Sequence, residues 1–212
     1  MSYYESLSQY INDLASRKPA PGGGSASALV GALSASLICM VANFTVGKEE
    51  FKNVEEKVKE ILSYAEELKE KLLRLVDADV ESYLNYSRIK KLPANTLQEK
   101  EVKKIKLQEA LISATKIPLE IMECGIKLLK LNEELVDKSN PLLISDLSIS
   151  VEFALLSINS ARENVYINIP YIKDKDFVQK SSRKVQEICL LSSQLAEKIR
   201  KKIQARRKKR EK

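Results

Sequence analysis

The chain contains no histidine and no tryptophan, and only three of its 212 residues are cysteines. Without histidine, general acid–base catalysis must rely on Asp, Glu, Tyr, Lys or Cys. Zinc sites are usually built from clustered Cys and His ligands, whereas Cys39, Cys124 and Cys189 are far apart and include no CxxC pair. Each cysteine lies in an apolar helical stretch, where a small buried side chain is typical. We therefore expect a cytoplasmic protein without a bound metal.

The start of the chain has no basic stretch followed by an apolar core, so we find no secretory signal peptide. Residues 26–46 carry no charge over about the length of a membrane span. They are rich in Ala, Ser and Gly, and Asn43 and Thr45 interrupt them, which favours a helix packed closely against others with these two side chains hydrogen-bonded inside. We expect no membrane association.

The net charge of +7 is concentrated at the C-terminus. Residues 200–212 contain nine basic residues and one acidic residue, which leaves the other 199 residues at −1. Such a run is typical of a solvated helix end or arm. We divide the chain into a helical domain, 1–199, and a basic tail, 200–212. A non-catalytic helical protein that binds nucleic acid or another polyanion through the tail is an alternative that we do not favour.

Apolar residues recur at helical spacing along most of the chain, and we find no alternating stretch that indicates a sheet. We expect helices at about 3–17, 25–47, 50–91 and 97–131, a fifth capped by Ser145 or Asp146 that ends before Pro170, and a sixth from Lys175 into the tail. Thr96 and Glu99 form the pattern of a capping box, and Pro118 is expected to kink the fourth helix. The sequence thus predicts an all-α, single-domain bundle of about six helices.

The second predicted helix is apolar on nearly every side, which indicates a buried central element of small residues. The fifth helix is similar in having little charge and many small residues. Because such helices need cover on all sides, we expect a homodimer.

Three of the six glycines form one triplet, within the segment PAPGGGSASA at residues 19–28. Glycine lets a partner approach the main chain closely, and Ser25 is placed to cap the helix that follows. The free N–H groups of a first helical turn can bind an anion or a polarised carbonyl. Gly22, Gly23, Gly24 and Ser25 are therefore candidate binding residues. The alternative is a tight turn between two packed helices.

Polar side chains inside apolar helices are the other candidates. Asp79 lies deep in the third helix and shares a face with Tyr83, four residues further on, whereas Asp77 points elsewhere. Simple exposure to solvent is the alternative for both aspartates. Arg162 is set in an apolar run, which predicts an anionic partner from the protein or from a ligand.

Six segments, in the order found here, resemble the formiminotetrahydrofolate cyclodeaminase / methenyltetrahydrofolate cyclohydrolase family. They are PAPGGGSASA (19–28), MVANFTVG (40–47), LVDAD (75–79), KLP (91–93), NPLLISD (140–146) and NVYIN (164–168). The resemblance covers the chain from about residue 5 to 180. This chain departs from the family pattern at Cys39, where small residues are usual, and at Tyr83, where Phe is frequent.

The resemblance implies an all-helical homodimer that acts on one-carbon derivatives of tetrahydrofolate, with no metal and no cofactor beyond that substrate. In the cyclodeaminase reaction, N10 attacks the formimidoyl carbon on N5, ammonia leaves and the 5,10-methenyl bridge closes. In the cyclohydrolase reaction, water adds to that bridge and gives 10-formyltetrahydrofolate. We expect the first reaction, which serves histidine degradation where the family is fused to a formimidoyltransferase domain, with the second as the alternative.

Both reactions need proton transfer at nitrogen, which a partly desolvated carboxylate can perform. We expect Asp79 first and Asp146 second as the acid–base group, and either could instead bind the pterin edge through two hydrogen bonds. The N–H groups of residues 22–25 would hold a carbonyl or carboxylate of the substrate. Further candidate binding residues are Asn43, Asn140 and Asn168, with Arg162 and Lys48 for the glutamate tail.

Overall fold

The computed structural model describes residues 6–210, and within this range the chain is helical with no strand. Its α-helices are α1 (Leu7–Leu14), α2 (Gly23–Asn43), α3 (Glu55–Lys90), α4 (Leu97–Val136), α5 (Ile144–Asn168) and α6 (Lys175–Arg210). Short 3₁₀ segments are η2 (Glu49–Val54), η3 (Pro141–Leu143) and η4 (Ile169–Tyr171). The predicted all-α bundle is confirmed.

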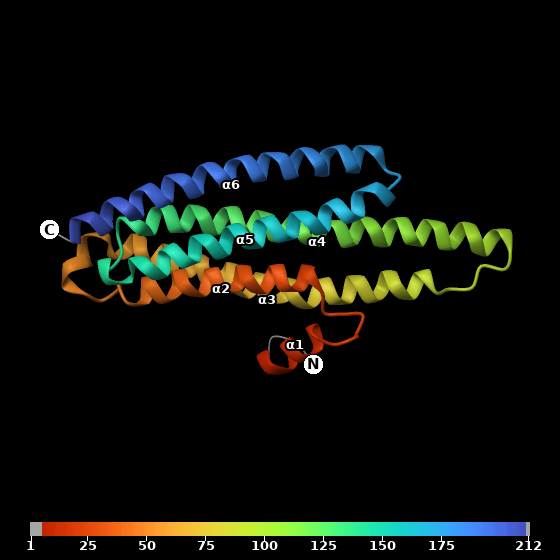
Figure 1. The fold of residues 1–212 in the computed structure, drawn as a ribbon, viewed down its shortest axis with the longest axis horizontal. Coiled ribbons are helices and arrows are strands. Elements are labelled where there is room, and N and C mark those ends of the chain that lie inside the picture. Colours follow the sequence, from red (N-terminus) through yellow and green to blue (C-terminus); the bar gives the residue numbers. More distant parts are fainter. Residues whose placement is uncertain (1–5, 211–212) are drawn as a thin grey trace.

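The helices α2 to α6 run side by side along the long axis of the molecule, and α1 stands apart from them (Figure 1). Helix α2 packs against α3 and α5, and α4 packs against α3, α5 and α6. The hairpin of α3 and α4 extends beyond the other helices at one end (Figure 1). This arrangement leaves the start of α2 beside the middle of α3.

Helix α2 is the buried central element that its composition predicts. Ala28, Ala35 and Ile38 are fully buried. A Cβ on Gly31 would lie 2.8 Å from Ser157 Oγ, so α2 and α5 are in close contact there. The hydroxyl of Ser157 donates to the carbonyl of Ser27 over 2.8 Å, which ties the two helices together with a buried hydrogen bond.

Helix ends follow the sequence signals at some points and depart from them at others. The capping box of Thr96 and Glu99 is confirmed at the start of α4. Ser25, however, is not a cap, because α2 begins at Gly23 with Gly22 as its N-cap. Ser145 and Asp146 do not cap α5 either, since its N-cap is Leu143 and both lie in its first turn. An acidic residue in a first turn still interacts favourably with the helix dipole.

The basic C-terminal segment begins as part of the bundle. Helix α6 continues without a break through residue 200, and Ile203 is 3% exposed in the core. Arg200 binds Glu152 with two hydrogen bonds of 2.8 and 2.7 Å. The guanidinium of Arg206 donates to the carbonyls of Val136 and Ser139 at the end of α4. The predicted boundary between residues 199 and 200 therefore lies inside helix α6 and does not coincide with the end of a secondary-structure element.

Two helical segments, Gly23–Asn43 and Pro141–Tyr171, are long and apolar enough to span a membrane by length and composition. In the first, 61% of the most apolar window is buried inside the bundle, and in the second 39%. Core helices of soluble proteins pass the same test, so this property is weak support for a membrane role.

Candidate active site

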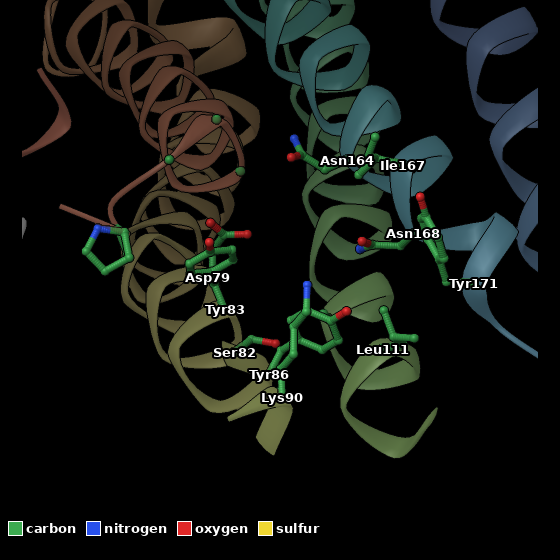
Figure 2. A pocket seen from close by; sticks show the side chains of 16 residues that line it. Asp79, Ser82, Tyr83, Tyr86, Lys90, Leu111, Asn164, Ile167, Asn168 and Tyr171 are labelled. Atoms are coloured by element: carbon green, nitrogen blue, oxygen red, sulfur yellow. The ribbon is translucent and has the colours of Figure 1, made fainter. Parts of the chain in front are cut away.

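A pocket of about 560 Å³ opens where the start of α2 faces α3, α4 and the end of α5. Figure 2 shows the side chains that line it, with those of α3 on one side and those of α5 and η4 on the other. Five of the predicted site residues line the pocket: Gly22, Gly23, Gly24, Asp79 and Asn168. The remaining lining residues are Pro19, Ala20, Ser82, Tyr83, Tyr86, Lys90, Leu111, Ala114, Asn164, Ile167 and Tyr171.

Asp79 joins two helices at the inner end of this pocket. Its Oδ2 accepts a hydrogen bond of 2.9 Å from the backbone N–H of Ser25. Helix α2 has no side-chain cap of its own at Gly22, so a carboxylate from α3 satisfies one of its free N–H groups. The negative charge also lies near the positive end of the α2 dipole. Asp79 thus takes the position in which a bound anion was expected.

The glycine triplet makes this contact possible, and Gly24 is the residue on which it depends. A Cβ on Gly24 would lie 2.1 Å from Asp79 Oδ1 and 2.6 Å from its Cγ. A Cβ on Gly22 would meet nothing within 4 Å, and one on Gly23 would only touch Asn164 Oδ1 at 4.0 Å. The group that approaches the glycine-rich segment closely is therefore a carboxylate of the protein itself, that of Asp79.

The surroundings of Asp79 raise the pKa of its carboxyl group. Burial removes water from the carboxylate and raises the pKa of Asp79, and the hydrogen bond from the Ser25 N–H opposes this increase. A carboxyl group with a raised pKa can both give and take a proton near neutrality. It is therefore suited to general acid–base catalysis in a protein without histidine.

The wall of the pocket on α3 follows helical spacing. Asp79 and Tyr83 line the same pocket, which confirms their predicted shared face, and Tyr86 and Lys90 continue the stripe. Figure 2 shows the Lys90 side chain running back into the pocket beside Tyr86. Tyr86 and Lys90 are not among the predicted residues, although both lie on the stripe that begins at Asp79.

The opposite wall comes from the end of α5 and from η4. Asn164 and Asn168, one turn apart on α5, line the pocket together with Tyr171. The Asn164 side chain donates to the carbonyl of Ser160 over 3.1 Å. The amide oxygen of Asn164 would lie near a Cβ on Gly23, so this wall faces the α2 N-terminus.

Four other predicted residues lie outside this pocket: Asp146, Asn140, Asn43 and Ser25. Asn140 precedes η3 and Asp146 lies in the first turn of α5, and eighteen residues separate Asp146 from Asn164, which corresponds to about 27 Å of helix. Asn140 is buried, where its N–H donates to Thr45 Oγ1 over 3.1 Å. Asn43, expected inside, is exposed at the end of α2, whereas Thr45 is buried as predicted.

Arg162 and Lys48 do not line the pocket either. The Arg162 guanidinium donates to Glu163 Oε1 over 3.1 and 2.9 Å, so its anionic partner belongs to the protein. Lys48 is exposed beside η2. Among the lining side chains, Lys90 is the one that carries a positive charge.

Within residues 6–210, no three Asp, Glu or Cys side chains gather in a group that could hold a metal ion. The fold and the pocket define an all-α protein with an enzyme-like cleft, in which one desolvated carboxyl group faces amide and tyrosine side chains. The sequence model of the formiminotransferase-cyclodeaminase family matches residues 6–187, and the chain belongs to this family.

Known relatives agree with this assignment. The chain is 34% identical over 199 residues to the methenyltetrahydrofolate cyclohydrolase of Methylorubrum extorquens, with 94% of this chain and 96% of that protein covered. It is 30% identical to the rat formimidoyltransferase-cyclodeaminase over 86% of this chain, and it spans only 34% of that protein. The crystal structure of formiminotetrahydrofolate cyclodeaminase from Thermotoga maritima superimposes with a TM-score of 0.85 at 28% identity, covering 94% of this chain and 96% of that chain.

Proposed function

We propose that this protein is a one-carbon tetrahydrofolate enzyme that closes or opens the carbon bridge between N5 and N10, with Asp79 as its general acid–base group. The observation that carries this proposal is the half-buried carboxyl group of Asp79, which lines the pocket and has a raised pKa. The names of its relatives in both sequence and structure support the substrate class.

The first reaction is cyclodeamination of 5-formimidoyltetrahydrofolate. N10 attacks the carbon of the formimidoyl group in its protonated amidinium form, and the ionised Asp79 takes the proton that N10 loses. The protonated Asp79 then gives this proton to the nitrogen of the tetrahedral intermediate, which leaves as ammonia while the 5,10-methenyl bridge forms. One carboxyl group that cycles between both states is sufficient. The structural similarity to the T. maritima cyclodeaminase supports this reaction.

The second candidate is hydrolysis of 5,10-methenyltetrahydrofolate to 10-formyltetrahydrofolate. Here Asp79 takes a proton from the attacking water and then protonates N5 as the bond from carbon to N5 breaks. The remaining hydroxyl proton is released to solvent as the formyl C=O forms. The end-to-end match with the M. extorquens cyclohydrolase favours it. Both reactions pass through a tetrahedral carbon between the same two nitrogens, so one pocket serves either.

The remaining pocket residues fit the rest of the substrate. The side-chain amides of Asn164 and Asn168 can donate to and accept from the pterin edge. Tyr83 and Tyr86 offer aromatic faces to the flat rings. Lys90, eleven residues and about 16 Å of helix beyond Asp79, would bind a carboxylate of the glutamate tail. This assignment replaces Arg162 and Lys48.

The proposal includes a cytoplasmic homodimer with no metal and no cofactor beyond the folate substrate. Exposed apolar side chains on α2 and α5 support an assembly: Leu33 is 46% exposed, Ile149 45% and Leu156 51%. Soluble proteins rarely leave large apolar patches uncovered. A monomeric mass in solution at micromolar concentration would contradict this part.

The test offers 5-formimidoyl- and 5,10-methenyltetrahydrofolate separately to the purified protein and follows the absorbance of the methenyl form. Asp79→Asn is expected to lower kcat about 10²- to 10⁴-fold on the active substrate, since it removes the acid–base group. Asp77→Asn is the matched control, because Asp77 lies on the same helix but does not line the pocket. Full activity of Asp79→Asn would refute its role. Absence of turnover on both substrates, together with no folate binding in calorimetry, would refute the enzyme proposal.

Lys90→Met tests the orientation of the substrate in the same assay. We expect KM to rise about tenfold at nearly unchanged kcat, as for a group that binds ground state and transition state alike. Lys91→Met is the control, because Lys91 follows Lys90 directly in the sequence and its exposed side chain does not line the pocket. Equal KM values for the two variants would contradict this orientation.

A further inference from the structure

Helix α1 buries two side chains, Tyr10 and Asp13, and Tyr10 is the one that joins the hydrophobic core. Figure 1 shows α1 apart from the other helices. Leu7 is 64% exposed, Ile11 50% and Leu14 36%, whereas Tyr10 is only 2% exposed and belongs to the core. Because Tyr10 is the large α1 side chain that is buried, its hydroxyl group must find a partner inside the protein.

Ser25, directly behind the pocket, is a partner of this hydroxyl group. The Tyr10 hydroxyl lies 3.0 Å from Ser25 Oγ, and Ser25 itself is fully buried. Ser25 Oγ also lies 3.0 Å from the carbonyl oxygen of Gly22, to which only the serine hydroxyl can donate. Serine has a single hydroxyl hydrogen, so when it donates to the Gly22 carbonyl, Tyr10 is the donor to Ser25 Oγ.

These bonds form a continuous path from α1 to the carboxyl group. The Tyr10 hydroxyl group is hydrogen-bonded to Ser25 Oγ, Ser25 Oγ is hydrogen-bonded to the Gly22 carbonyl, and the Ser25 N–H donates to Asp79 Oδ2 over 2.9 Å. The Ser25 side chain is thereby held from both sides and ties the first turn of α2 in place, and it is from this turn that the Ser25 N–H binds Asp79. Buried chains of this kind strengthen one another.

We infer that Tyr10 is a positioning residue for Asp79, and that α1 holds the catalytic carboxyl group in place through Ser25. Tyr10 does not line the pocket, so it acts from behind the wall without touching the substrate. The inference rests on the proposed role of Asp79. It assigns a function to α1, a helix whose other large side chains contribute little to the core.

The other groups around Asp79 leave this path as its main polar contact. Helix α2 has no charged residue, and the lining residues from α4 and α5 are not titratable. The titratable groups that face the pocket or Asp79 in the described structure are Tyr10, Tyr83, Tyr86, Lys90 and Tyr171. Burial raises the pKa of Tyr10, the hydrogen bond with Ser25 opposes this increase, and the nearby Asp79 adds to it, so the Tyr10 hydroxyl group stays protonated.

The test combines Tyr10→Phe, Ser25→Ala and the double variant. Tyr10→Phe keeps the ring and removes only the hydroxyl group. We expect kcat to fall about tenfold and KM to change less than twofold, with the acidic limb of the pH–rate profile shifted to higher pH. The shift follows because a poorly directed Ser25 N–H stabilises the ionised carboxyl group less well. Tyr64→Phe, which removes a partly exposed hydroxyl from α3 away from the pocket, is the matched control and should behave as wild type.

The double variant shows whether the effect passes through Ser25. If it does, Tyr10→Phe added to Ser25→Ala has no further effect on kcat or on the pH limb, whereas independent effects would multiply. A carbon-detected NMR titration of Asp79, assigned with Asp79→Asn, measures the same shift without any substrate. An unchanged Asp79 titration in Tyr10→Phe would overturn the inference. An altered titration in a protein that turns over no folate would instead refute the proposed function and leave the positioning role standing.

Discussion

Replacing Gly24 by alanine tests the link between the glycine triplet and the catalytic carboxyl group. The new Cβ would lie 2.1 Å from Asp79 Oδ1, whereas ordinary contacts begin at 3.4 Å, so the carboxyl group must retreat by roughly 1.3 Å. Such a movement takes Oδ2 out of hydrogen-bonding range of the Ser25 N–H, which is now at 2.9 Å. Both the stability of the fold and the position of the acid–base group depend on this contact.

The expected magnitudes follow from these two effects. Overpacking of a buried site costs about 1–3 kcal/mol, and the lost hydrogen bond to a charged group contributes about 1.5–3 kcal/mol. Because the two effects overlap, we expect the free energy of unfolding to fall by about 2–4 kcal/mol. A displacement of about 1 Å at a reacting group lowers kcat about 10²-fold.

Gly22→Ala is the matched control, because a Cβ at Gly22 meets nothing within 4 Å and its φ of −138° suits alanine. We expect a loss of about 1 kcal/mol or less, since alanine is a poorer N-cap residue than glycine, and activity near wild type. The assays are urea unfolding followed by circular dichroism and turnover of the active folate substrate.

A double variant identifies the cause of the Gly24→Ala effect. Asp79→Ala removes the atoms that the new Cβ would strike, so Gly24→Ala should cost much less stability in that background. We expect a coupling of at least about 1 kcal/mol in the resulting cycle. Equal stability and activity of Gly24→Ala and Gly22→Ala, or no coupling to Asp79, would refute the reasoning.

Two further predictions concern stability. Because burial raises the pKa of Asp79 in the folded protein, wild-type stability should fall as pH rises from about 4 through that raised pKa, by about 1.4 kcal/mol per unit of pKa difference between the folded and unfolded states. Urea unfolding between pH 4 and 8 should show this slope in wild type and not in Asp79→Asn, and parallel profiles would contradict it. Deletion of residues 200–212 should lower the free energy of unfolding by at least about 2 kcal/mol, since it exposes the site of Ile203 and removes the Arg206 bonds to α4. Deletion of 207–212 keeps both residues and should cost less than about 0.5 kcal/mol, and equal losses for the two deletions would contradict the structural role of Ile203 and Arg206.

Local signals in the sequence predicted the helices well. Hydrophobic spacing identified six helices and the central position of α2, and the capping box marked the start of α4. These features depend on neighbours within about four residues, so all the interacting groups are contained in a short stretch of sequence. The shared face of Asp79 and Tyr83 follows from the same short-range geometry.

The caps that failed show the limit of such signals. Ser25 has the side chain of an N-cap residue, yet the helix begins before it, and its N–H is satisfied by Asp79, which is 54 residues away in the chain. No local pattern reveals a cap supplied by another helix. Asp146 and Asn140 form a convincing motif, but both lie near the N-terminal end of α5, a continuous helix whose C-terminal end lines the pocket.

By itself, the sequence determined the all-helical class, the buried small-residue helix, the glycine triplet and Asp79 as candidates, because each depends on residue type and short-range spacing. Only the tertiary structure decided which candidates meet. It joined Gly24 to Asp79, brought Lys90 rather than Arg162 to the pocket, and connected Tyr10 to Ser25. The physical reason is that hydrogen bonds and van der Waals contacts between helices depend on how the helices pack, which the spacing along one helix does not contain.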